Sequence, residues 1–125
     1  MSNHNEITIN GVTHTLRKSK TDLNNLEVLF HAVLANKRGV IETDRDSLDK
    51  LNGIIYDVSL WINSSIGGIG ELLVYAEQRE LSEDCIKDIG WLLAGLSELR
   101  FSLADASVVI DETRESLNNA HKKTA

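Results

Sequence analysis

Two long rows of mostly apolar residues, spaced alternately three and four positions apart, constrain this chain more than any other feature. Such spacing keeps every member of a row on one stripe of a helix, and rows sustained over several heptads are typical of helices that pack on each other. The first row is Leu48, Leu51, Ile55, Val58, Ile62, Ser65, Ile69, Leu72 and Ala76. The second row is Cys85, Ile89, Leu92, Leu96, Leu99, Leu103, Ala106, Ile110, Thr113, Leu117 and Ala120. The 125 residues include no proline, so nothing in either row forces a helix to break.

Capping residues indicate where the two long helices begin. Thr43 precedes a helix predicted over 44–79, and Ser82 precedes a helix predicted over 83–120. Hydroxyl side chains at this position accept hydrogen bonds from the first helical turn. The link between the helices is too short for anything but an antiparallel hairpin. Residues 121–125 are expected to form a frayed tail.

The glycine-rich stretch 66–70 changes the composition of the first row but not its phase. Two helices separated by a loop would have little reason to keep one register, so we predict a single helix through Gly67 and Gly68. Gly90 and Gly95 repeat this composition on the second long helix. We expect these small residues to allow close approach of a neighbouring helix, with a kink or room for a small ligand as alternatives.

Three residues in the rows are not ordinary core hydrophobes. Ser65 and Thr113 are polar, and a polar residue in such a row can fix the register or the oligomeric state, or line a polar pocket. Cys85 lies at a helix N-terminus, where a thiolate is stabilised, but its position in the row favours a role in core packing.

The N-terminal segment 6–17 alternates apolar and polar residues around Asn10-Gly11, which is a strong signal for a two-residue β-hairpin turn. This turn predicts that Ile9 and Val12 pair, that Ile7 and His14 pair, and that Leu16 lies on the same face as these four residues. An isolated hairpin is marginally stable in water. The hairpin should therefore lie on the helices, pair with a second copy or dock a partner.

A shorter helix is predicted over 21–38, between the hairpin and the first long helix. Ser19 or Thr21 can cap its start, and Gly39 supplies a residue that tolerates the left-handed conformation at its end. Its apolar stripe is Leu23, Leu26, Phe30 and Val33, and Leu29 and Leu34 widen it enough for a helix that faces the core. The predicted fold class is mainly α, with an N-terminal β-hairpin, one medium helix and a long antiparallel helical hairpin in a single domain over 1–125.

The charge of the chain disfavours nucleic acid as a partner. The net charge is −6; residues 1–41 carry 5 basic and 3 acidic side chains, whereas residues 42–125 carry 8 basic and 16 acidic ones. Binding to phosphates requires clustered Lys and Arg. The one basic cluster, Arg17, Lys18 and Lys20, is interpreted as a solvated entry to a helix, so a DNA-binding regulator ranks below the other binding functions.

No catalytic, cofactor-binding or metal-ligating pattern is found in the sequence. The four histidines lack the spacing of metal ligands, Glu27 and His31 are read as a surface pair, and the glycine-rich stretch lacks the Lys-Ser/Thr of a phosphate loop. The single cysteine, the absence of a signal-peptide pattern and the interrupted apolar stretches predict a cytoplasmic protein that does not enter a membrane. We expect a non-enzymatic protein without a cofactor.

The two long helices carry more apolar side chains than their rows can bury. The predicted medium helix is roughly half as long as the helices that it would have to cover. We therefore predict a homo-oligomer, most simply a dimer in which two helical hairpins form a four-helix bundle. The predicted interface residues are Leu60, Trp61, Ile66, Leu73, Trp91, Leu93, Phe101 and Val108.

Acidic residues near the predicted hairpin tip offer an electrostatic contact for a basic partner. They are Glu77, Glu80, Glu83, Asp84 and Asp88. The leading hypothesis is a small acidic interaction protein, an adaptor or inhibitor, that binds a protein partner. The alternative is a small-molecule or nucleotide-binding protein with the ligand at the oligomer interface, where Trp61, Tyr75 and Trp91 could stack on a planar ligand.

Overall fold

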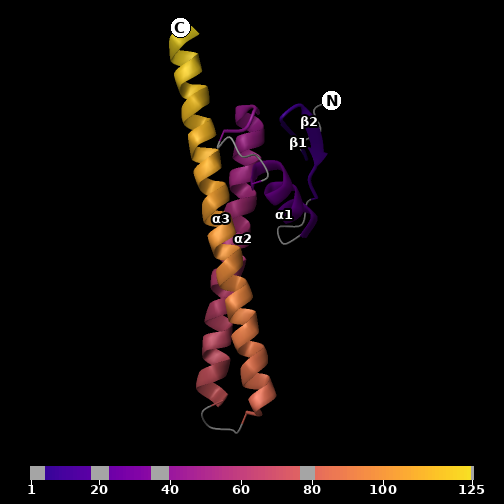
Figure 1. The fold of residues 1–125 in the computed structure, drawn as a ribbon, viewed down its shortest axis with the longest axis vertical. Coiled ribbons are helices and arrows are strands. Elements are labelled where there is room, and N and C mark those ends of the chain that lie inside the picture. The colour runs from indigo at the N-terminus through magenta and orange to yellow at the C-terminus, as the bar shows by residue number, and fades with distance from the viewer. Residues whose placement is uncertain (1–4, 18–22, 35–39, 77–80, 125) are drawn as a thin grey trace.

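The computed structural model describes residues 5–17, 23–34, 40–76 and 81–124. Within them the chain is mainly helical, with an N-terminal two-stranded antiparallel sheet, a short helix and a long helical hairpin (Figure 1). The sheet and the short helix form an N-terminal module that packs against one end of the helical hairpin, leaving the other end as a bare pair of helices. The expected fold class is therefore confirmed at the level of one chain.

The β-hairpin has the predicted register. Strand β1 (Glu6–Ile9) pairs with β2 (Val12–Thr15), and the pairs include Ile9 with Val12 and Ile7 with His14. The turn residues Asn10 and Gly11 have φ of 52° and 78°, as a type I′ turn requires. Val12 pairs with Ile9 as predicted, yet Val12 is 55% exposed, whereas Ile9 is 2% exposed.

The hairpin lies on the helices, one of the three placements expected for it. The backbone N–H of Asn10 donates to the carbonyl of Glu42 at 2.7 Å, and the N–H of Glu42 donates to Asn10 Oδ1 at 2.8 Å. An isolated bridge also joins Ile9 to Thr43. The chain that leads into the first long helix thus runs along β1 and satisfies polar groups on its outer edge.

Helix α2 (Arg45–Ala76) begins one residue later than predicted, and its cap is Asp44 rather than Thr43. Asp44 Oδ1 accepts a hydrogen bond from the N–H of Ser47 at 2.7 Å. Thr43 is unavailable for this role because its hydroxyl donates to the carbonyl of Thr8. The predicted end of this helix, at residue 79, lies outside the described residues.

The medium helix predicted over 21–38 is not a uniform α-helix. It consists of α1 (Leu23–Leu29) and a π-helical segment η1 (Phe30–Leu34), while the rest of the predicted range lies outside the described residues. Leu29 and Val33 are fully buried, whereas Leu26 and Phe30 of the predicted stripe are only partly buried. Where η1 packs against α3, the buried face is therefore the part of the widened stripe that contains Leu29 and Val33.

Helix α3 (Glu83–Thr124) begins where expected but extends four residues beyond its predicted end. Ser82 Oγ accepts a hydrogen bond from the N–H of Cys85 at 3.1 Å, which confirms the predicted cap. The frayed tail was a wrong prediction for 121–124, because α3 continues to Thr124 and no glycine or proline ends the helix there. At about 1.5 Å per residue α3 is roughly 63 Å long, and its C-terminal end passes the start of α2 (Figure 1).

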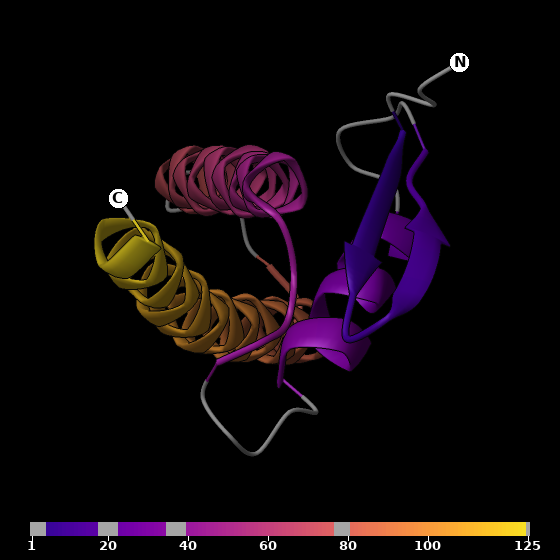
Figure 2. The ribbon, with the colours of Figure 1, turned by 90° about the horizontal axis from the view of Figure 1, so that it is seen from above.

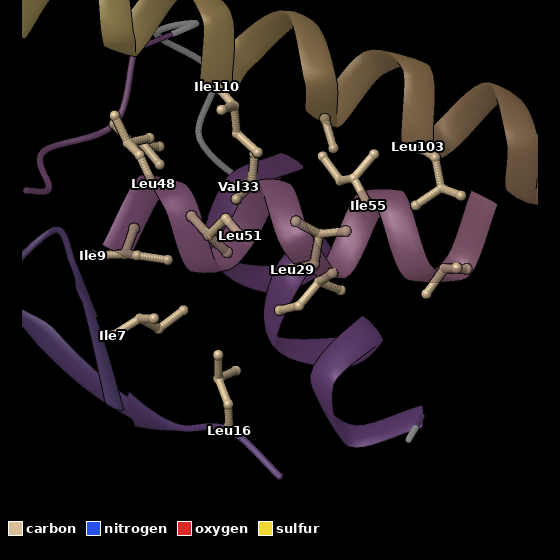
Figure 3. Packing of buried hydrophobic residues seen from close by; sticks show 14 of the residues in the cluster. Ile7, Ile9, Leu16, Leu29, Val33, Leu48, Leu51, Ile55, Leu103 and Ile110 are labelled. Carbon is tan, nitrogen blue, oxygen red and sulfur yellow. The ribbon is translucent and has the colours of Figure 1, made fainter. Parts of the chain in front are cut away.

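The core lies where the N-terminal module meets both long helices (Figure 3). Ile7 and Ile9 from β1 and Leu29 and Val33 from α1 and η1 point toward Leu51 of α2 and its neighbours. Seen from above, the module occupies one side of the α2–α3 pair (Figure 2). Residues buried on α2 and α3 are Ser47, Leu48, Leu51, Ile54, Ile55, Val58, Ile62, Leu96, Leu103, Ala106, Ile110 and Thr113.

Candidate interaction surface

The end of the helical hairpin away from the N-terminal module, which we call the arm, comprises residues 63–76 of α2, residues 83–95 of α3 and, directly before α3, Leu81 and Ser82. None of these residues is buried, whereas the preceding Ile62 and the following Leu96 are almost fully buried. The body, which is the remainder of the described chain, therefore contains the whole buried core. In the arm only two helices lie side by side (Figure 1).

The arm keeps the spacing of the two apolar rows but not their burial. Leu72 and Leu92 belong to the rows, yet they are 66% and 52% exposed. Two helices without a third element cover only a narrow strip of each other, so these row residues remain accessible to water. Tyr75 and Trp91, outside the rows, are 72% and 74% exposed. The arm thus presents a concentration of apolar surface.

The residues predicted to form an oligomer interface are all at least partly accessible in the single chain. Six are exposed, and Ile66 and Leu93 are partly buried. The exposed residues are Leu60, Trp61, Leu73, Trp91, Phe101 and Val108. The structure does not gather the eight on one surface, because Leu60 lies on the face of α2 opposite its row and Phe101 and Val108 lie on the corresponding face of α3.

These opposite faces carry two further rows with spacing of three and four residues, which the sequence analysis missed. The outer row of α2 is Gly53, Tyr56, Leu60, Asn63, Gly67, Gly70 and Val74. The outer row of α3 is Lys87, Gly90, Ala94, Ser97, Phe101, Ala104, Val108 and Asp111. Every member of both rows is exposed. The signal that could have found them is a second apolar or small-residue heptad pattern, half a turn out of phase with the first.

The glycines of the long helices do not mediate close packing within the chain. A Cβ atom built on Gly67, Gly68, Gly70, Gly90 or Gly95 would meet no atom within 4 Å. The expectation of close backbone approach was therefore wrong for α2 against α3, because these glycines face away from the contact between the two helices. Helix α2 nevertheless continues through the glycine-rich stretch, as predicted.

The acidic residues predicted to contact a partner lie at the start of α3, as far as they are described. Glu83, Asp84 and Asp88 are exposed, while Glu77 and Glu80 lie outside the described residues. Glu83 and Asp84 occupy the first turn of α3, where carboxylates stabilise the helix through its dipole. These two residues thus have a structural role beside any role in binding.

Thr113, one of the two polar residues in the rows, has a role within the chain. It is 1% exposed, its Oγ1 accepts a hydrogen bond from the N–H of Ile41 at 3.1 Å, and it donates to the carbonyl of Val109 at 2.7 Å. The bond between Ile41 and Thr113 attaches the segment before α2 to α3. Ser65, the corresponding residue in the arm, is only partly buried.

Sequence reasoning also missed a second buried polar anchor, Asn25. Its Oδ1 accepts from the N–H of Arg17 at 2.7 Å, and its Nδ2 donates to the carbonyl of Arg17 at 2.8 Å. The pair of bonds fixes the segment that follows β2 against α1. An asparagine in a helical stripe gives no signal for this, because its partner is backbone that lies before the helix and outside its periodic pattern.

Two hollows lie on the described surface, and neither is enclosed by several elements as a ligand pocket usually is. One of about 460 Å³ is lined by residues of α3 alone: Glu112, Glu115, Ser116, Asn119 and Ala120. The other, of about 250 Å³ between α2 and α3, is lined by Ser59, Ile62, Asn63, Arg100 and Leu103. Arg100 donates a hydrogen bond to Asn63 across it. Ligand pockets usually have volumes of about 300–1,000 Å³. Among the described residues, no three His, Cys, Asp or Glu side chains are grouped so that they could hold a metal ion.

Glu27 and His31 form the surface pair expected from their spacing, with 3.8 Å between Oε1 and Nε2. Both side chains are largely exposed. No described helix has the length and apolar character needed to cross a bilayer.

Comparison with protein-family models, curated proteins and solved structures gave no match for this chain. The exposed apolar surface of the arm is therefore the main basis for a proposed function.

Proposed function

We propose that this protein is a non-enzymatic interaction protein, an adaptor or inhibitor, whose helical hairpin associates with a second copy of the chain and then binds a protein partner. The observation that carries the proposal is the arm, in which both long helices leave apolar side chains in water. Fully burying one such side chain is worth about 1.5–3 kcal/mol. Several of them together favour association, as large apolar patches generally do.

The distribution of charge also supports association through the arm. Glu71 is the one charged residue in 58–76 of α2, and residues 89–97 of α3 carry none. A surface helix in a monomer usually has a polar face toward water. The acidic start of α3, next to this uncharged surface, remains the proposed contact for a basic partner. We also propose a cytoplasmic setting, since the single cysteine allows no intrachain disulfide.

Native mass spectrometry of the full chain, combined with light scattering after size exclusion, tests the proposal. We expect an even-numbered oligomer without added mass. A variant with Trp91, Phe101 and Val108, which are all exposed on α3, replaced by Gln should shift to the monomer while keeping its helical circular dichroism. The matched control is Val12→Gln, which removes an apolar side chain of similar exposure from the body and should not change the mass.

A monomer at every concentration would refute the association. An oligomer that carries a discrete extra mass, lost on denaturation, would instead favour the small-molecule alternative with a ligand at the interface. Partner binding is tested separately with Glu83, Asp84 and Asp88 replaced together by Lys. Pull-down of a partner by the native chain but not by this variant, at equal helix content, is the expected result.

A further inference from the structure

We infer that the outer row of α3 is the self-association surface, and that two copies of this chain pack there with their α3 helices antiparallel. The twofold axis crosses the outer row between Ser97 and Phe101, at the level of Leu99 along the helix. This inference rests on the proposed function and names its interface. The outer row extends from Lys87 to Asp111, lies on the side of α3 away from α2, and is exposed at all eight positions. Phe101 and Val108 are 71% and 54% exposed.

The sequence of the row is self-complementary in side-chain size. In an antiparallel pair of helices, residues equally far from the twofold axis in opposite directions lie level with each other. About Leu99, Phe101 comes level with Ser97 of the second copy and Val108 with Gly90. Each large side chain thus faces a small one, and in the layer between them Ala104 lies level with Ala94 of the second copy. Interdigitation of this kind allows close packing without overlap.

The ends of the row are complementary in charge. With the same axis, Lys87 lies level with Asp111 of the second copy, and the twofold symmetry repeats this pair at the other end. Between them the row has no charged residue. Opposite charges at the rim around an uncharged centre fix the direction and register of association more than they add to its affinity. Glu98 and Arg100 flank the row on opposite sides, at the hydrated rim.

The outer row of α2 is a weaker candidate for this contact. It contains Asn63, whose Oδ1 accepts a hydrogen bond from Arg100, so covering the row would bury a polar side chain and its charged partner. If two copies packed antiparallel on the outer row of α2, with the twofold axis at the centre of that row, no opposite charges would come together at the ends of the row. With α3 at the dimer interface, the two α2 rows lie on the outside of the assembly.

Disulfide trapping tests the arrangement in a Cys85→Ser background. Ala94 and Ala104 are both replaced by Cys in one chain; ten helical residues separate them by about 15 Å, too far for an intrachain bond, because a disulfide needs Cα atoms about 4.4–6.8 Å apart. We expect near-complete conversion of this double variant to a covalent dimer. The matched single variants, Ala94→Cys and Ala104→Cys, should remain uncross-linked.

The outcomes separate this inference from the proposed function. Cross-linking of the single variants would indicate parallel helices and overturn the arrangement. A dimer by mass that none of the variants traps would overturn the interface while leaving the association intact. A monomer throughout would refute the proposed function itself.

A charge placed in the row provides a second measurement. Phe101→Glu should raise the dimer dissociation constant by at least about 100-fold, because both copies lose a buried aromatic ring and gain a charge. Tyr56→Glu, the matched control on the outer row of α2, should change it less than about threefold. Equal effects of the two substitutions would contradict the assignment to α3.

Discussion

The body and the arm are built from the same two helices with the same spacing of apolar residues, yet only the body has a core. In the body Leu48 and Leu51 are fully buried, because β1, α1 and η1 cover the side of the hairpin that α2 and α3 leave open. In the arm Leu72 continues the same row and is mostly exposed. The periodicity of a sequence therefore predicts which face of a helix is apolar, but a third element decides whether that face is buried.

Truncation of one leucine in each region tests this difference between the body and the arm most directly. We expect Leu51→Ala to lower the free energy of unfolding by about 2–5 kcal/mol, since it leaves a cavity in the core. Leu72→Ala, the same chemical change in the arm, should alter it by less than about 0.5 kcal/mol. Urea denaturation followed by circular dichroism, at a protein concentration below the dimer dissociation constant, measures both. A large effect of Leu72→Ala would mean that the arm is covered within one chain.

The two polar residues in the rows provide a second, smaller contrast. Thr113→Val keeps the side-chain shape but leaves the N–H of Ile41 buried without its acceptor, so it should cost about 1–3 kcal/mol. Ser65→Val removes a hydroxyl that is still accessible to water and should be neutral or slightly stabilising. Similar losses for both variants, in the same denaturation assay, would show that Ser65 also has a structural partner.

The smallest expected effects are those of glycine substitutions. These substitutions distinguish the outer row of α2 from the outer row of α3. Gly67→Ala in the arm and Gly53→Ala in the body should each stabilise the monomer by about 0.5–1 kcal/mol, because a Cβ has free space at both positions. Gly90→Ala should stabilise the monomer similarly. In the twofold arrangement, however, Gly90 faces Val108 of the second copy, so this variant alone should weaken dimerisation, by several-fold in analytical ultracentrifugation.

Most of the fold could be predicted because it depends on interactions that are local in sequence. The Asn10-Gly11 turn determines the strand register, and Ser82 determines the start of α3. Errors arose where distant contacts decide the outcome. Asp44 replaced Thr43 as the cap because β1 engages Thr43. In the medium helix, the α-helical pattern did not indicate the π-helical segment η1, which packs against α3.

The candidate surface was predictable in part. A surplus of apolar residues could be recognised from composition and spacing, and Leu60, Phe101 and Val108 were identified in this way. The distribution of these residues over opposite faces could not be predicted. A helix that is apolar on several sides has no unique buried face until its neighbours are known. The glycines illustrate the same ambiguity, since small residues suit both a close contact and an open surface.

The hydrogen bond between Ile41 and Thr113 joins residues 72 positions apart, and this separation has a kinetic consequence. Contacts between α2 and α3 in the arm close short loops but bury little surface. Contacts between α2 and α3 in the body bury the core, but only after a long loop has closed. Early steps of folding therefore gain little free energy. We expect the formation of the contacts in the body to limit the folding rate, and stopped-flow refolding of Thr113→Val tests this expectation. A chain that is still folding would expose its arm for recognition before its core has formed.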